Sequence, residues 1–148
     1  MTAQLPAWFR FFNGRLVLLS FVTAVLMASC ATRERFATST VVPAATGEVK
    51  VKKDDNNNYS VKVSVENLAD PKRLPQPRSV YVVWAQTGGG NPQNLGQLRS
   101  SSGLFGSKLK AELETVTAYK PSRVFITAEE VPTVQYPSSY VILNTNTF

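Results

Sequence analysis

Two stretches in the first half of the chain alternate between polar and apolar residues. Residues 48–53 and 59–66 place an apolar side chain, mostly valine, at every second position, and the polar run 54–58 separates them. Period-two alternation is typical of a strand with one buried face, and a short Asn/Asp-rich connection suits a tight turn. The pattern predicts a β-hairpin.

Shorter apolar runs between Pro, Gly and Ser turns predict the remaining strands. Every residue of 80–84 is apolar, as expected of a strand that is covered on both faces or lies at the centre of a sheet. The three prolines within 70–77 exclude that stretch from a central strand, because proline donates no ladder hydrogen bond. Further strands are expected at residues 95–99, 108–116, 123–128 and 140–143, with a break at 100–103. Segment 108–116 also contains good helix formers, but its Thr and Val residues favour a strand.

These segments together predict an all-β fold, an antiparallel β-sandwich of about seven strands with immunoglobulin-like character. The sandwich is expected to span residues 46–148, and roughly 100 residues are enough to bury a core without disulfides. Residues 30–45 are rich in Thr, Ser and Ala and show little periodicity. We expect them to form a flexible tether.

The beginning of the chain has the layout of a secretory signal peptide. Residues 16–28 carry no charge and follow Arg10 and Arg15, so a basic region precedes a short apolar one. A membrane span needs about 20 apolar residues, and this run is shorter. We therefore expect a signal peptide over residues 1–29, with an uncleaved signal anchor as the alternative.

The four residues that end this run carry a more specific signal. Met27-Ala28-Ser29-Cys30 resembles the lipobox of bacterial lipoproteins, although Met27 stands where a leucine is usual. The resemblance implies cleavage before Cys30, thioether attachment of diacylglycerol to Cys30, and acylation of the new amino group, for example with palmitate. Two or three acyl chains give stable anchoring where one does not. A buried or free cysteine is the alternative.

The residue after the lipobox cysteine bears on localisation. In enteric bacteria an aspartate at that position resembles an inner-membrane retention signal, and this chain has Ala31 instead. The resemblance therefore implies a lipid-anchored protein of the cell envelope, in the outer membrane and facing the periplasm rather than in the inner membrane.

Composition restricts the chemistry. The chain of 148 residues has one Cys and no His, which excludes an intramolecular disulfide and a Cys/His zinc site. The usual base of Ser-His and Cys-His catalysis is absent as well. Adjacent Glu129 and Glu130 would point to opposite faces of a strand, and no histidine activates the serines at 100–102. We expect no enzyme activity, no cofactor and no metal site, and the Asp/Asn run 54–58 is interpreted as a turn.

The charge balance gives little reason to expect a nucleic-acid partner. The formal net charge is +6, and removing residues 1–29 leaves 14 basic and 10 acidic residues, a net charge of +4. Only Lys50, Lys52 and Lys53 cluster, which is too sparse for a nucleic-acid footprint. We interpret this cluster as a solvated strand face.

Several short motifs occur in the order seen in one family. They are Tyr81-Val-Val-Trp84, Asn91-Pro92 followed by Leu95-Gly96, Phe125-Ile-Thr-Ala-Glu129, and Tyr136-Pro137 before Tyr140-Val-Ile-Leu143. Together they resemble the extracytoplasmic C-terminal domain of the anti-sigma-K factors, over about half the chain. The chain lacks that family's cytoplasmic sigma-binding region and membrane helix, so the resemblance implies the fold and a sensing or partner-binding role, without sigma-factor inhibition.

The function expected from the sequence is therefore that of a non-catalytic, lipid-anchored envelope protein. Its partner would be another envelope protein, or a peptide strand added at a sheet edge. The alternative is a ligand- or glycan-binding sensor module, with Trp84, Tyr119, Tyr136 or Tyr140 lining a groove. For Trp84 we favour a core position over a stacking platform.

Overall fold

The computed structural model describes residues 31–101 and 110–148. Cys30 and the predicted signal peptide lie outside these residues. In the described part the chain forms nine strands and a short 3-10 helix, η1 (Pro71–Arg73). The strands are β1 (Ala31–Arg35), β2 (Thr46–Lys53), β3 (Tyr59–Glu66), β4 (Val80–Gln86), β5 (Gln93–Gln97), β6 (Arg99–Ser101), β7 (Lys110–Thr117), β8 (Arg123–Glu129) and β9 (Val141–Asn144).

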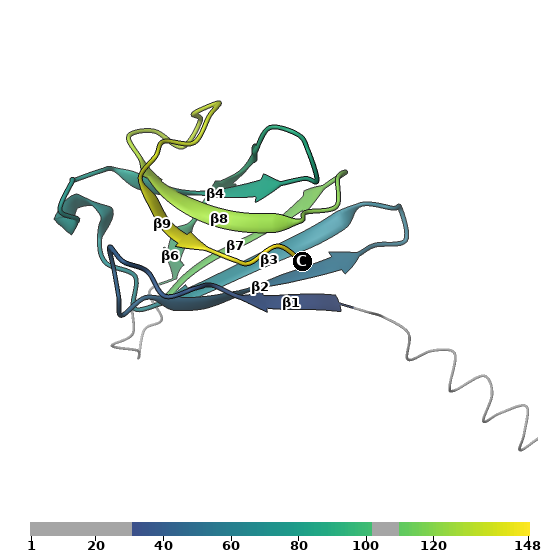
Figure 1. Ribbon diagram of the computed structural model, residues 1–148, viewed down its shortest axis with the longest axis horizontal. Coiled ribbons are helices and arrows are strands. Elements are labelled where there is room, and N and C mark those ends of the chain that lie inside the picture. The colour runs from purple at the N-terminus through teal and green to yellow at the C-terminus, as the bar shows by residue number, and fades with distance from the viewer. Residues whose placement is uncertain (1–30, 102–109) are drawn as a thin grey trace, which may run out of the picture. The chain divides into compact units, whose positions relative to one another are not determined.

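The strands form two antiparallel sheets that lie face to face (Figure 1). One sheet has the order β1-β2-β3-β7-β6, and the other has the order β5-β4-β8-β9. The predicted all-β sandwich is confirmed. None of the helices in residues 31–101 and 110–148 has the length and apolar character needed to cross a membrane.

The strand order is that of an immunoglobulin sandwich with two additions. Constant-type immunoglobulin domains pair strands A-B-E-D in one sheet and C-F-G in the other. Here β2-β3-β7-β6 corresponds to A-B-E-D, and β4-β8-β9 corresponds to C-F-G. The additional strands are β1, at the edge beside β2, and β5, at the edge beside β4.

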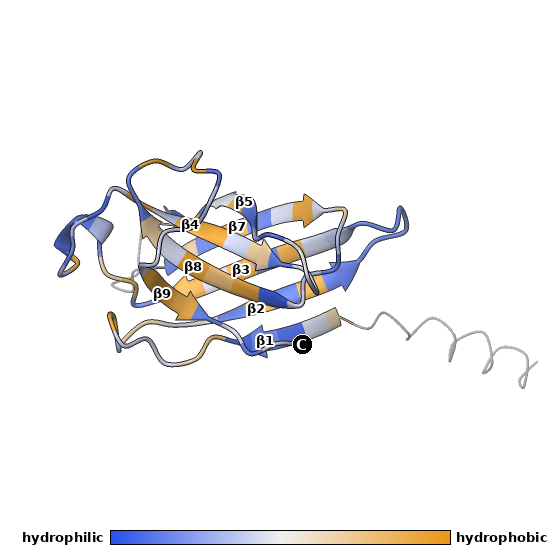
Figure 2. Ribbon diagram, turned by 45° about the horizontal axis from the view of Figure 1, so that its top comes forward, coloured by the Kyte–Doolittle hydropathy of each residue, from blue (hydrophilic) through white to orange (hydrophobic). Residues whose placement is uncertain are grey.

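The core lies between the sheets and is built by the alternation in the sequence. Val61, Val63 and Val65 of β3 are at most 1% exposed, and they pack in one cluster with Val83 of β4 and Ile126 of β8. Figure 2 shows β4 and β8 as mainly hydrophobic strands, as expected where both faces of a strand are covered. The continuous apolar run of β4 therefore predicted its central position correctly.

The predicted hairpin is confirmed as β2 and β3, paired from Thr46↔Glu66 to Lys53↔Tyr59. Its turn is closed by the Asp54 carboxylate, which accepts the backbone N–H groups of Asn56 at 2.9 Å and Asn58 at 2.8 Å. Asn57 takes a positive φ of 63°, which asparagine tolerates better than most residues. The described part of the segment predicted at 108–116 is likewise a strand, β7, which begins at Lys110.

The prediction of a flexible tether over residues 30–45 is wrong for its described part. Ala31–Arg35 forms the edge strand β1, paired with β2 from Ala31↔Lys52 to Arg35↔Glu48. The following segment is also packed, since Ser39, Val42 and Ala45 are buried. An edge strand exposed on both faces has no apolar alternation, so the usual strand signal is missing. The folded domain thus includes residues 31–45.

The strand predicted at 95–99 is also corrected, because the chain changes sheet within it. β5 ends at Gln97 in one sheet and β6 begins at Arg99 in the other. Leu98 between them is 5% exposed in the core, and its N–H donates to the Tyr81 carbonyl at 3.0 Å. The predicted break at 100–103 is wrong for Ser100 and Ser101, which belong to β6.

Candidate functional site

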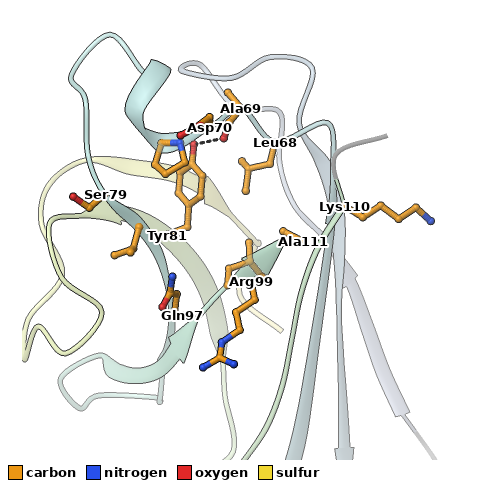
Figure 3. Close-up of a pocket in the computed structure, with 12 residues that line it drawn as sticks. Leu68, Ala69, Asp70, Ser79, Tyr81, Gln97, Arg99, Lys110 and Ala111 are labelled. Atoms are coloured by element: carbon orange, nitrogen blue, oxygen red, sulfur yellow. Dashed lines mark hydrogen bonds between the residues drawn. The ribbon is translucent and has the colours of Figure 1, made fainter. Parts of the chain in front are cut away.

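The described surface has a cleft of about 550 Å³ at one end of the sandwich (Figure 3). It lies where β3 leaves its sheet and where β4 and β7 begin. The residues that line it come from four separate segments: Leu68–Pro71, Ser79–Tyr81, Gln97–Arg99, and Lys110 with Ala111. We call this end of the molecule the cleft end. The volume falls within the range of small-molecule sites.

The cleft has apolar walls and charged groups at its rim. Leu68, Tyr81 and Ala111 are buried, whereas Arg99 and Lys110 are exposed. Figure 3 shows the Arg99 and Lys110 side chains extending in different directions, away from each other. Lys110 Nζ forms an ion pair with Glu66 at 3.1 Å. The charged groups therefore do not converge on one point, as they would in a site built for acid–base chemistry.

Tyr81 is the polar group set deepest in the cleft. It is 5% exposed, and its hydroxyl donates a hydrogen bond to the Ala69 carbonyl at 2.9 Å (Figure 3). Burial, with smaller contributions from Asp70 and Tyr140, raises the pKa of the phenol. The hydroxyl therefore stays neutral at physiological pH and holds the β3–β4 connection against β4.

Trp84 does not line a groove. It is 0% exposed and stacks with Phe125, with ring centroids 6.4 Å apart and planes 14° apart. Trp84 and Phe125 lie on the outer face of the four-stranded sheet, in a cluster separate from the main core, with Val134 packed against them. Figure 1 shows the β8–β9 loop, drawn in yellow, on that side of the sheet. The favoured interpretation of Trp84 as a packed residue is confirmed. It packs beneath the β8–β9 loop and not between the two sheets.

A chain of hydrogen bonds holds this loop down. Trp84 Nε1 donates to Thr127 Oγ1 at 2.8 Å, and the Thr127 hydroxyl donates to Glu129 Oε1 at 2.6 Å. The same carboxylate oxygen accepts the backbone N–H of Ser138 at 2.8 Å. Glu129 is 5% exposed, so this buried carboxylate has a structural part in the loop. Glu130 is exposed and pairs with Arg78 at 3.4 Å.

The other aromatic residues of the sensor hypothesis do not gather. Tyr119 and Tyr136 are 60% and 69% exposed, but one lies in the β7–β8 loop and the other in the β8–β9 loop, so β8 separates them. Tyr140 is half-buried, and the Arg78 guanidinium lies 5.7 Å from its ring centroid. These four aromatic residues therefore share no groove.

Candidates for metal or catalytic chemistry find little support in the part of the chain that the structure describes. No three Asp or Glu side chains there gather to hold a metal ion. The Asp54 carboxylate, the best oxygen donor of its run, is used by the turn. Of the serines at 100–102, Ser100 and Ser101 are strand residues, while Ser102 lies outside the described residues.

The sheet edges are poorly suited to accept an added peptide strand. β6 has 3 residues and β9 has 4. β5 is interrupted by a bulge, where Gly96 takes a φ of 125°, and β1 carries Arg33, Glu34 and Arg35. Short length, bulges and charge are the features by which proteins protect sheet edges from further pairing.

No pattern in the sequence indicated the cleft. Its lining residues are up to 43 positions apart in the chain, from Leu68 to Ala111, and no local pattern links them. Comparison with protein-family models, with curated proteins and with solved structures gave no match for this chain.

Proposed function

We propose that the protein is a non-catalytic envelope lipoprotein, anchored through acyl chains on Cys30, whose β-sandwich binds a partner protein at the cleft end. The outer membrane, on its periplasmic side, is the location that the residue after the lipobox favours. The similarity to the anti-sigma-K factor C-terminal domain agrees with a binding role outside the cytoplasm. The immunoglobulin topology is compatible with that similarity, but it is shared by many unrelated domains.

The observation that carries the proposal is the position of the two ends of the sandwich. Ala31, bonded to Cys30, pairs with Lys52 beside the β2–β3 turn. The cleft begins just beyond the other end of β3, at Leu68. A strand of the length of β3 spans about 25 Å. A lipid on Cys30 would hold the turn end at the membrane and leave the cleft open to the periplasm.

The cleft is a better candidate for partner binding than the sheet edges, because those edges are short, bulged or charged. Its apolar walls and charged rim match the general anatomy of protein interfaces, with an apolar centre and a polar border. We therefore propose binding in the cleft, in place of strand addition.

The first experiment tests the anchor. Wild-type protein in growing bacteria is expected to incorporate radiolabelled palmitate and to fractionate with membranes, whereas Cys30→Ser should lose the label and retain the signal peptide. Ser29→Ala, which keeps a small residue before the cysteine, is the matched control and should behave as wild type. Unchanged labelling, size and fractionation of Cys30→Ser would refute the lipoprotein assignment.

The second experiment tests the cleft. A photo-crosslinking amino acid placed at Ser79, on the cleft rim, is expected to trap a specific envelope protein in living cells. The same amino acid at Thr133, an exposed position in the β8–β9 loop, is the control. Equal adducts from both positions, or none from Ser79, would argue against a protein partner in the cleft.

A ligand-binding sensor is the second candidate, and the size of the cleft is what favours it. This form of the hypothesis needs no aromatic groove, since the buried Tyr81 and the apolar walls would form the site. The test uses a soluble envelope extract from which the macromolecules have been removed. If this extract raises the melting temperature of the purified protein, the sensor candidate is supported. No shift would count against it.

A further inference from the structure

The outer face of the five-stranded sheet carries an uneven distribution of charge. In the register, Arg33 lies opposite Lys50, and Lys50 lies opposite Lys62. Since directly paired residues share a face, these three side chains form one row across β1, β2 and β3. Arg35 and Lys52 lie on the same face, in the neighbouring rows. We call these five residues the basic face.

On β1 and β2, one carboxylate lies on the same face as the basic residues. Glu48 lies among the five basic residues and pairs with Lys50 at 3.0 Å and with Arg33 at 3.9 Å. The hydrogen bond from Lys50, together with the charges of Arg33 and Arg35, lowers the pKa of Glu48. On β7, Glu114 lies opposite Lys62 and pairs with it at 3.3 Å, while Glu112 lies farther along the strand and Glu66 of β3 lies at the cleft end. The positive charge is therefore concentrated on the β1 side of the sheet.

The basic face lies next to the first described residue, since Ala31 pairs with Lys52. Ala31, Lys52, Ser60 and Val116 form the row of this face that lies nearest the β2–β3 turn. Val116 in that row is 59% exposed, an unusual position for a large apolar side chain. Figure 2 shows β1 and the β2–β3 turn as mainly hydrophilic. Because β1 is part of the sheet, only the Cys30–Ala31 peptide bond connects the basic face to the proposed lipid site.

We propose that the basic face lies against the anionic phospholipid headgroups of the membrane that holds the protein. The proposal rests on lipid attachment at Cys30. One residue spans at most about 3.6 Å, so Ala31 would lie in or beside the headgroup layer. Lys and Arg side chains near an anionic surface are attracted to it within a Debye length, and Val116 can contact the interface. The sandwich would thus have a preferred orientation on the membrane, with the four-stranded sheet directed away from it.

The test uses the full-length lipidated protein in vesicles. With Cys30 acylated, Ser60→Cys introduces one free thiol, at the row between Lys52 and Val116, for an environment-sensitive fluorophore. Thr133→Cys, on the side of the other sheet, is the matched control. Lipids that carry a quencher are included in vesicles of phosphatidylglycerol and phosphatidylethanolamine, and in vesicles of phosphatidylcholine.

We expect several-fold stronger quenching at position 60 than at position 133 in the anionic vesicles. The difference should decrease in phosphatidylcholine, at high salt, and in the Lys50→Gln/Lys52→Gln variant. Lys72→Gln/Arg73→Gln, which removes the same charge at η1, should leave the difference unchanged.

Equal quenching at the two positions, or quenching at position 60 that ignores salt and the Lys50/Lys52 substitutions, would overturn the proposal while leaving the lipid anchor intact. The same outcome is expected if the basic face binds an acidic protein and not lipid. Mass spectrometry of the same preparations reports the acyl chains. Protein that carries none would overturn both this proposal and the lipoprotein assignment.

Discussion

The indole N–H of Trp84 on β4 donates to the hydroxyl of Thr127 on β8 at 2.8 Å, and both side chains are fully buried. This bond lies outside the main core, beneath the β8–β9 loop. It connects through Glu129 to the backbone of that loop. An outer sheet face that would otherwise be exposed is thereby made into a second small core.

Thr127→Val tests this network with almost no change of shape. The substitution leaves the Trp84 N–H without its acceptor and removes a donor to Glu129. We expect a loss of about 1–3 kcal/mol in the free energy of unfolding, measured by urea denaturation. Thr133→Val, at an exposed position, should change it by less than about 0.5 kcal/mol. An equally small effect at Thr127 would show that the network adds nothing to stability.

Tyr81 should make stability depend on alkaline pH. Its folded-state pKa is raised above the ordinary value of 10.0, so the unfolded chain releases this proton at lower pH than the folded protein. The stabilisation is therefore complete below pH 10 and declines as the pH rises above it.

Tyr81→Phe separates this effect from the titration of other groups. At neutral pH it should cost about 1 kcal/mol, through loss of the bond to the Ala69 carbonyl. The difference from wild type should narrow above pH 10 in urea denaturation series. Tyr119→Phe, at an exposed position, is the control. A difference that stays constant with pH would show that Tyr81 titrates normally.

Gly47 is required by close contact between β2 and β3. A Cβ at this position would lie 2.5 Å from the backbone carbonyl oxygen of Ser64, which cannot move without disturbing the ladder. Gly47→Ala should therefore destabilise the domain by about 1–3 kcal/mol, seen as a lower melting temperature. Gly89→Ala meets nothing within 4 Å and should be nearly neutral. Similar melting temperatures for both variants would contradict the close packing.

The β2–β3 turn should depend on Asp54 and be indifferent to calcium. Asp54→Ala removes the acceptor for two backbone N–H groups and is expected to cost about 1 kcal/mol in urea denaturation. Asp55→Ala, at the exposed neighbouring position, should cost less. If calcium raised the melting temperature of the wild type but not of Asp54→Ala, the run would be a cation site and the turn interpretation would be wrong.

Local pattern was sufficient wherever one strand face is buried. The alternating valines of β3 predicted a strand within a hairpin, and the all-apolar run of β4 predicted a strand at the centre of a sheet. Burial of one face or of both faces determines these residue patterns directly, so the sandwich class was predictable as well. The bulge at Gly96 and the opposite faces of Tyr81 and Trp84 were also predictable, since both depend on a few neighbouring residues.

Features that depend on distant partners were not predictable. Ala31–Arg35 has no apolar alternation, and it is a strand only because its backbone pairs with β2. Residues 95–99 divide between two sheets at Leu98. The Leu98 side chain is buried in the core, and its N–H donates to the Tyr81 carbonyl. The basic face was visible in part as Lys50 and Lys52, but the register with β1 brings Arg33 and Arg35 beside them. The sequence by itself determined the all-β class and the candidate anchor at Cys30. Only tertiary pairing decided that residues 31–45 belong to the folded domain, where the cleft opens and which charges share a face, because these depend on contacts between residues far apart in the chain.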